Sequence, residues 1–311
     1  MASTVDTQAD FVVPEMPSFT KGYHHRPYPA ISPSRPEIAA AAAGKNVVIT
    51  GGGTGIGKAI AIAFAQAGAR SVAILGRRAD RLQQTAAEIK SAAAEHGHSP
   101  IIITEAVDLM QRDKVDSAFQ SIQTKVGSGA GATYLDVLVS NAGMAPGMGP
   151  VLGYDANVMI ETLRINVLSA FNAVNAWMPF SPQDGSAVLL NVSSMTAHAA
   201  PMITNFPYSI AKAANLKMID FFAAENPAVH VVSLQPGIIN TELGGEEKPS
   251  YVAPDTTDLP GQFCVWLLTP EARFLKNKFV WANWDVEELV ARKDEIVGTR
   301  ALTWGVEGVL V

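Results

Sequence analysis

The sequence has almost no cysteine, and this limits the chemistry available to the protein. Cys264 is the single cysteine among 311 residues. An intrachain disulfide needs two thiols and a cysteine-based zinc site needs a cluster of them, so the composition excludes both. A chain without disulfides suits a reducing compartment. We therefore expect a cytoplasmic protein without a metal site.

Long apolar runs and dense basic runs are also missing. No segment reaches the about 18 consecutive apolar residues that span a bilayer, and the first residues carry Asp6, Asp10 and Glu15 instead of the apolar core of a signal peptide. The net charge is -6 and the Lys and Arg residues do not cluster. Nucleic acids and anionic membranes need a basic surface. We expect a small-molecule ligand and neither of those partners.

Residues 1–44 lack any helix or strand period before the alanine run Ala39–Ala43, and they are rich in proline. This composition is typical of an extension that is poorly ordered or wraps the surface. The neighbours His24 and His25 have no second ligand pair and are poor evidence for a metal site. We expect that removal of residues 1–35 leaves folding nearly unchanged.

From residue 45 onward, β-rich and helix-periodic segments alternate. We expect strands at 46–50, 71–75, 101–107, 135–139, 187–192 and 229–234, and helices at 58–67, 80–94, 112–126, 156–178 and 208–224. Strands that alternate with helices form βαβ units and a parallel sheet. The sequence therefore predicts one α/β domain over residues 45–311, a Rossmann-like doubly wound parallel sheet with helices on both faces.

A glycine-rich loop lies between the first expected strand and helix. Gly51, Gly55 and Gly57 have the spacing G-x-x-x-G-x-G, which differs from the G-x-G-x-x-G fingerprint. Glycines let a backbone approach a pyrophosphate, and a helix amino terminus offers it free N–H groups. The context of strand, loop and helix predicts a dinucleotide site, although a glycine-rich surface turn is the alternative.

The end of the second expected strand bears on the choice of dinucleotide. Folds that bind NAD place a carboxylate about 20 residues after the glycine loop, whereas an arginine accommodates the 2′-phosphate of NADP. This sequence has Arg77 and Arg78 there and no carboxylate. NADP is therefore favoured over NAD, which the sequence also allows. The alternative is that the two arginines are exposed on a solvated turn and bind no phosphate.

Tyr208 and Lys212 are the strongest candidates for chemistry. They are four residues apart, so a helix places them on one face. An ammonium close to a phenol favours the phenolate and lowers the phenol pKa from about 10. Ser194 lies at the end of an expected buried strand, where α/β sheets bind their ligands. Tyr208 is the candidate general acid.

These motifs together resemble the short-chain dehydrogenase/reductase family, and the carboxyl-terminal segment Phe279–Asp285 resembles its fungal members. The residues that carry the resemblance cover about residues 45–241 and are Thr50, Gly51, Gly52, Gly53, Thr54, Gly55, Ile56, Gly57, Asp108, Asn141, Ala142, Gly143, Asn166, Ser194, Tyr208, Lys212, Pro236, Gly237 and Thr241. The resemblance implies hydride transfer between NAD(P) and a carbonyl or alcohol, without a metal. It also implies a homodimer or homotetramer that forms through the helices bearing Asn166 and Tyr208.

The resemblance also implies roles for these residues. Tyr208 would protonate the carbonyl oxygen, Lys212 would lower the Tyr208 pKa and bind the nicotinamide ribose, and Ser194, in preference to its neighbour Ser193, would polarise that oxygen. Asn166 would hold a water of the proton relay. The adenine would lie on Asp108 with Leu109, the segment Asn141-Ala142-Gly143 would line the cofactor and brace the central strand, and Pro236 and Gly237 would lead to Ile239 and Thr241 beside the nicotinamide amide. Thr54 departs from the basic residue that NADP-dependent members often carry.

The sequence therefore predicts an NADPH-dependent reductase of a ketone or aldehyde in a small, apolar substrate. The expected substrate walls are the segments 144–153, 195–206 and 238–273. Their apolar side chains either line an adaptable pocket or belong to the core, and these are Met144, Met148, Met195, Met202, Phe206 and Trp266. Three alternatives remain: alcohol oxidation, a non-redox reaction on the same fold, and a non-catalytic dinucleotide-sensing module.

Overall fold

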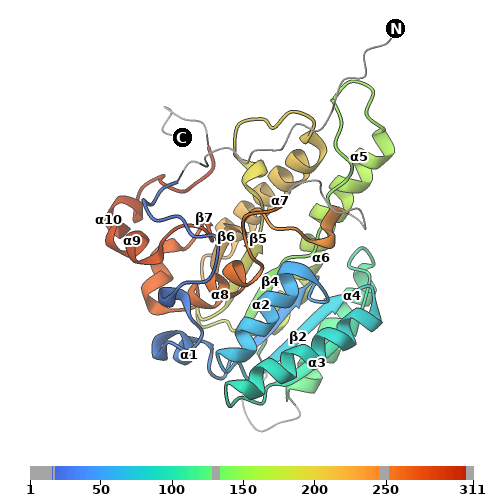
Figure 1. The fold of residues 1–311 in the computed structure, drawn as a ribbon. Helices are drawn as coiled ribbons and strands as arrows, with labels where there is room; N and C mark the ends of the chain where they lie inside the picture. The colour runs from blue at the N-terminus through green and yellow to red at the C-terminus, as the bar shows by residue number, and fades with distance from the viewer. Residues whose placement is uncertain (1–15, 17, 128–133, 245–251, 306–311) are drawn as a thin grey trace.

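The computed structural model describes residue 16 and residues 18–127, 134–244 and 252–305. Its centre is a parallel sheet of seven strands in the order β3-β2-β1-β4-β5-β6-β7 (Figure 1). The strands are β1 (Asn46–Thr50), β2 (Ser71–Gly76), β3 (Ile101–Ala106), β4 (Val137–Ser140), β5 (Val188–Val192), β6 (His230–Gln235) and β7 (Lys278–Trp281). The order reverses between β1 and β4, so the predicted doubly wound sheet is confirmed.

Both faces of the sheet are buried. On β1, Val47 and Ile49 belong to one hydrophobic core and Val48 belongs to the other. This is the alternation of side chains that a strand imposes. Core residues of α2 (Gly55–Gln66), α3 (Ala79–Glu95) and α8 (Asp258–Trp266) cover the first face, and those of α4 (Arg112–Gly127), α6 (Ser169–Trp177) and α7 (Phe206–Glu225) cover the second (Figure 1).

The expected single helix over residues 156–178 is interrupted. It consists of α5 (Ala156–Leu163), a π-helical stretch (Arg164–Leu168) and α6, followed by a short 3-10 turn (Met178–Phe180). Periodicity does not distinguish a π-helical insertion from a continuous helix, so the sequence alone missed it. Such insertions are frequent at functional sites.

The carboxyl-terminal part contains elements that the sequence analysis did not identify. These are α8, β7 and the short helices α9 (Val286–Ala291) and α10 (Lys293–Ile296). The strand β7 has only four residues, too few for a convincing alternation, and it pairs with β6 by placing Phe279 beside Ser233. The aromatic segment near residue 280 thus completes the sheet.

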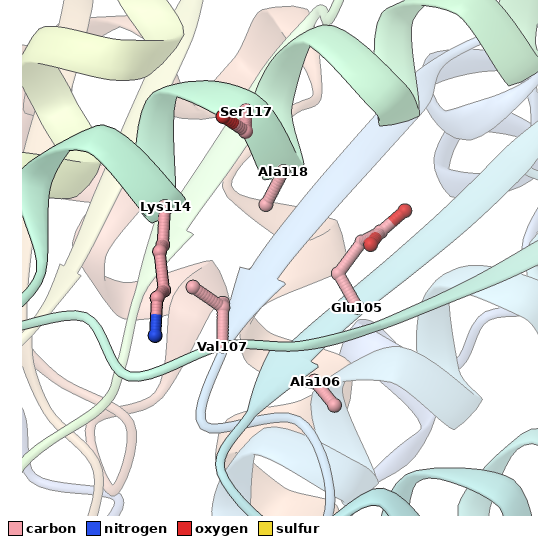
Figure 2. A pocket seen from close by; sticks show the side chains of 6 residues that line it. All are labelled: Glu105, Ala106, Val107, Lys114, Ser117 and Ala118. Atoms are coloured by element: carbon pink, nitrogen blue, oxygen red, sulfur yellow. The ribbon is translucent and has the colours of Figure 1, made fainter.

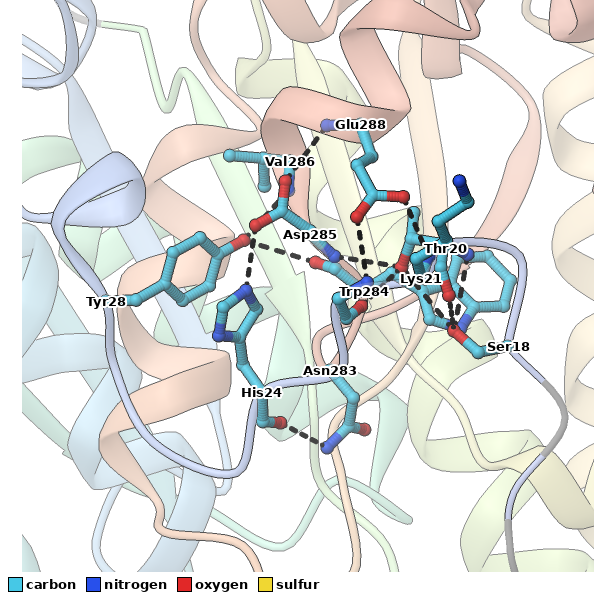
Figure 3. A network of polar contacts seen from close by, with 11 residues as sticks. Ser18, Thr20, Lys21, His24, Tyr28, Asn283, Trp284, Asp285, Val286 and Glu288 are labelled. Atoms are coloured by element: carbon cyan, nitrogen blue, oxygen red, sulfur yellow. Dashed lines mark hydrogen bonds and ion pairs between the residues drawn. The ribbon is translucent and has the colours of Figure 1, made fainter.

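The described part of the amino-terminal extension packs on this carboxyl-terminal region. His24 donates its backbone N–H to the carbonyl of Asn283 at 2.7 Å, and its ring stacks on Tyr28 at a centroid distance of 3.5 Å. The Glu288 carboxylate accepts hydrogen bonds from the backbone of Lys21 and Gly22 (Figure 3). The helix α1 (Pro36–Ala42) follows with its own buried side chains. The expected disorder of positions 1–15 and 17 concerns residues outside the described ones.

Candidate active site

Tyr208 and Lys212 lie one turn apart near the start of α7. Pro207 occupies the first turn of this helix, where its missing N–H costs nothing. The Nζ of Lys212 lies 5.7 Å from the ring centroid of Tyr208 and donates to the carbonyl of Val192 at 3.0 Å. The lysine is therefore fixed between α7 and the end of β5, with 5 % of its surface exposed.

Ser194 follows β5, and its hydroxyl lies close enough to the Tyr208 phenol to act on the phenol pKa. The Thr196 hydroxyl lies 3.0 Å from the Ser194 hydroxyl, and the Thr196 backbone N–H donates to the same oxygen at 3.3 Å. The neighbouring Ser193 hydroxyl is buried and has no hydrogen-bond partner among the described residues. The structure thus brings Ser194, rather than Ser193, to the phenol.

The pKa values at this site differ from the sequence expectation. Burial raises the pKa of the Tyr208 phenol, and the nearby Ser194 hydroxyl opposes the shift without reversing it. Burial also lowers the pKa of Lys212 to about 8. We expected the ammonium to lower the phenol pKa. In the structure the ammonium faces the Val192 carbonyl and the face of the ring, so burial outweighs any effect of the charge on the phenol.

Asn166 lies in the π-helical stretch and links three segments. Its Nδ2 donates to the carbonyls of Met144 and Thr162 at 2.9 Å each, and its Oδ1 accepts from the Met144 N–H at 3.3 Å. A Cβ on Gly143 would lie 2.7 Å from the Asn166 Oδ1 and 3.6 Å from the Lys212 Nζ. The structure therefore brings Asn166, Gly143 and Lys212 together, as a shared site requires.

The glycine loop is held against the end of β4. The Asn141 Nδ2 donates to the carbonyls of Thr50 and Gly51 at 3.0 and 3.3 Å. A Cβ on Gly57 would lie 2.3 Å from the Gly51 carbonyl oxygen, so a larger residue would disrupt the loop. The φ angle of Gly55 is 56°, a left-handed conformation that suits glycine.

The amino end of α2 has the features of an anion-binding helix terminus. Thr54 is the N-cap, but its side chain makes no capping hydrogen bond. The first N–H groups of a helix have no partner within it, and they attract an anion. The methyl carbon of Thr241 would lie 3.3 Å from a Cβ on Gly55, so the segment after β6 reaches the glycine loop. Ile56 is the second residue of α2.

The residues expected at the adenosine end also lie near one another. The pKa of Asp108 is lowered, first by a hydrogen bond from the Met110 N–H and also by the charge of Arg77. Arg77 and Arg78 are exposed just before α3. A guanidinium nitrogen of Arg78 lies 2.9 Å from the Glu242 carboxylate. Leu109 is buried, and its carbonyl accepts from Asn172.

Two hydrogen bonds connect the three expected substrate walls. The Ala145 N–H donates to the Leu243 carbonyl at 3.1 Å, and the Gly149 N–H donates to the Thr204 carbonyl at 2.8 Å. Met148 and Met202 are exposed on these walls. Met195 and Trp266 are buried in the hydrophobic core. Of the two roles expected for these side chains, pocket lining or core packing, the structure shows core packing for both.

Sequence reasoning missed three residues that contact the expected site: Thr196 beside Ser194, Glu242 beside Arg78, and Asp255 behind Gly237. No motif spacing marks them, because their contacts depend on how the loops fold over the sheet. The pocket in Figure 2, with a volume of about 280 Å³, lies between β3 and α4 and contains none of the expected site residues.

The sequence model described as short chain dehydrogenase matches residues 45–251. The chain belongs to the short-chain dehydrogenase family. It is 32% identical to the short chain dehydrogenase/reductase AacuD of Aspergillus aculeatus over 286 residues, which are 89% of this chain and 92% of that protein. It is 33% identical to a short chain dehydrogenase/reductase of Claviceps purpurea, over 81% of this chain and 82% of that protein.

Solved structures agree with this assignment. An alcohol dehydrogenase of the archaeon Thermococcus sibiricus, in complex with 5-hydroxy-NADP, superimposes with a TM-score of 0.61 and 26% identity, over 72% of this chain and 90% of that one. The protein is therefore an NAD(P)-dependent oxidoreductase that acts on CH–OH or C=O groups. Among the described residues, no helix combines the length and apolarity needed to cross a membrane.

Proposed function

We propose that this short-chain dehydrogenase is an NADPH-dependent reductase of a ketone or aldehyde in a small, apolar substrate, with Tyr208 as the general acid. The observation that carries the proposal is the contact of Ser194, Tyr208 and Lys212 at the carboxyl end of β5. These are the groups needed to bind a carbonyl oxygen and protonate it as it gains negative charge.

A bound nicotinamide cofactor would supply a hydride to the carbonyl carbon, and the protein would supply the proton. Ser194 donates a hydrogen bond to the carbonyl oxygen and the Tyr208 hydroxyl transfers its proton to the same oxygen, which gives the alcohol. The raised pKa keeps Tyr208 protonated at neutral pH. Lys212 would bind the nicotinamide ribose, and Asn166 would hold a water through which the proton of Tyr208 is replaced.

NADP(H) is the proposed cofactor because the 2′-phosphate would lie beside cationic groups. Arg77 and Arg78 lie before α3, at the end of β2, where a doubly wound fold places the adenosine ribose. The NADP analogue bound to the Thermococcus enzyme supports this choice. The remaining expected cofactor residues keep the roles that the family implies, namely Gly51, Thr54, Gly55, Ile56, Gly57, Asp108, Leu109, Asn141, Ala142, Gly143, Pro236, Gly237, Ile239 and Thr241.

An apolar substrate is proposed from the exposed side chains at the mouth of the site. Met148, Leu152 and Ile203 have exposed fractions of 75%, 88% and 91% on the two walls that the Gly149–Thr204 hydrogen bond joins. Large apolar side chains on adjacent loops are typical of a surface that closes on an apolar ligand.

Oxidation of NADPH by purified protein over a panel of ketones and aldehydes tests the proposal. We expect absorbance at 340 nm to fall with apolar carbonyls and an alcohol to form. Activity with alcohols and NADP alone would favour the reverse reaction. Cofactor binding without turnover on any substrate would favour the sensing module, and product formation without cofactor consumption would favour a non-redox reaction.

The same proposal includes a homodimer or homotetramer in the cytoplasm. Large apolar side chains are exposed on the helices that flank the site: Ile160 on α5, Phe171 on α6, and Ile210 and Phe221 on α7. A second copy of the chain would cover this surface. Light scattering should give a multiple of the chain mass of 32.9 kDa, and Phe221→Asp should reduce it. The cytoplasmic location rests on the single, buried Cys264.

A further inference from the structure

A buried carboxylate holds the loop that follows β6. The Asp255 Oδ2 accepts from the Ile238 N–H at 2.5 Å, and the Asp255 N–H donates to the Ile238 carbonyl at 3.2 Å. The Asp255 side chain is 1% exposed. A Cβ on Gly237, which has a φ of 115°, would lie 2.8 Å from the same Oδ2. Asp255 therefore fixes the turn at Gly237 and Ile238 through both its side chain and its backbone.

The second oxygen of this carboxylate is bound by the amino-terminal extension. The His25 Nδ1 lies 2.6 Å from the Asp255 Oδ1, across 230 positions of sequence. An ionised carboxylate only accepts hydrogen bonds, so Nδ1 carries the proton. The His25 carbonyl also accepts from the Thr256 N–H at 3.0 Å. The extension therefore forms hydrogen bonds with both Asp255 and Thr256 through His25.

A buried carboxylate is stable only when its oxygens are paired. Each Asp255 oxygen has one of these two partners, His25 for Oδ1 and the Ile238 N–H for Oδ2. Loss of the imidazole would leave Oδ1 without this donor in a buried site. The carboxylate would then rotate or admit water, and the hydrogen bond that fixes Ile238 would loosen.

We propose that His25 and Asp255 are positioning residues for the nicotinamide end of the cofactor site. The inference rests on the proposed function, in which Ile239 and Thr241 flank the nicotinamide amide directly after the turn that Asp255 holds. A displacement of about 1 Å in a group that orients a reactant can cost roughly 100-fold in rate. The amino-terminal extension therefore supports hydride transfer as well as the fold.

His25→Ala and its matched control His24→Ala test the proposal. Each variant removes one imidazole that is bound to a carboxylate on the domain, but the His24 partner is Asp285, the N-cap of α9, whereas the His25 partner is Asp255, which holds the turn at Ile238. We expect His25→Ala to lower kcat about 5- to 50-fold, and His24→Ala to keep kcat within twofold. Both variants should lower the melting temperature by a similar amount.

Cofactor binding gives a second measurement that needs no turnover. We expect His25→Ala to weaken NADPH several-fold in fluorescence titrations, and to leave 2′-phospho-ADP-ribose, which lacks the nicotinamide ring, unchanged. His25→Gln offers an amide N–H to Asp255 and should recover most of the loss. Asp255→Asn retains an oxygen for the Ile238 N–H, so its loss should be smaller than that of Asp255→Ala.

Equal kcat values for His25→Ala and His24→Ala would overturn the proposal, as would an equal loss of affinity for NADPH and 2′-phospho-ADP-ribose. The proposal would also be overturned if kcat fell in proportion to the melting temperature in both variants, because His25 would then only stabilise the fold. If the wild-type protein binds NADPH and reduces no carbonyl, the proposed reductase function fails by itself. The affinities for NADPH and 2′-phospho-ADP-ribose still decide whether His25 and Asp255 position the nicotinamide end of the site.

Discussion

The ammonium of Lys212 lies under the ring face of Tyr208, with 5.7 Å between Nζ and the ring centroid. Both side chains are carried by one face of α7, and the Val192 carbonyl holds the ammonium in place. The phenol hydroxyl instead meets Ser194. The two residues therefore face different parts of the site, which allows their functions to be separated by mutation.

Tyr208→Phe should remove proton transfer and leave cofactor binding intact. The variant keeps the ring that packs over Lys212 and removes only the hydroxyl that meets Ser194. We expect turnover to fall by about 10²–10⁴, the usual contribution of a positioned general acid, with little change in the Kd for NADPH. Steady-state kinetics and a fluorescence titration measure the two effects. Near wild-type reduction of carbonyls by this variant would show that the hydroxyl is not the acid.

The pH dependence of reduction should report the protonation of Lys212. Its folded-state pKa is lowered to about 8, so the ammonium predominates at pH 7 and is lost as the pH rises through 8. The pKa of Tyr208 is raised, so the phenol keeps its proton over this interval. We expect kcat to fall above about pH 8. In Lys212→Arg, whose guanidinium stays charged, this decline should move to higher pH even if the maximum rate is lower. A decline at an unchanged pH would assign it to another group.

The elements nearest the site could be predicted because their signals are local. The glycine loop lies between a strand and a helix in sequence, and the spacing of Tyr208 and Lys212 is one helical turn. In contrast, the contact between His25 and Asp255 joins positions 230 residues apart, and no periodicity marks either residue. The π-helical stretch around Asn166 is equally hidden, because its apolar pattern is that of an ordinary helix. Long-range packing decides both features.

Substitutions of Arg77 and of Glu242 should change the affinity for NADPH, relative to NADH, in opposite directions. Arg77→Asp replaces a cation expected at the 2′-phosphate by a repelling carboxylate, so the Kd for NADPH should rise about 10- to 100-fold more than that for NADH. Glu242 pairs with Arg78 at 2.9 Å. Glu242→Gln should free that guanidinium and tighten NADPH a few-fold without affecting NADH.

Lys90→Asp is the matched control for the charge change, since Lys90 is exposed farther along α3. It should leave both dissociation constants within twofold. Titrations with the two cofactors at fixed ionic strength make the comparison. If Arg77→Asp weakens NADPH and NADH equally, the arginine does not select the 2′-phosphate.

Removal of residues 1–35 should destabilise the protein, which is the opposite of our expectation from composition. The deletion would take away Ile31, which is fully buried, and the hydrogen bonds of Tyr28 and His24 with residues 283–286. Burial of one such side chain contributes about 1.5–3 kcal/mol and each hydrogen bond about 1 kcal/mol. We expect the melting temperature to fall by roughly 10 °C or more. Removal of residues 1–15 alone eliminates none of these contacts and provides the control. If the two truncated proteins unfold at the same temperature as the full chain, the packing of the extension adds nothing measurable to the stability of the domain.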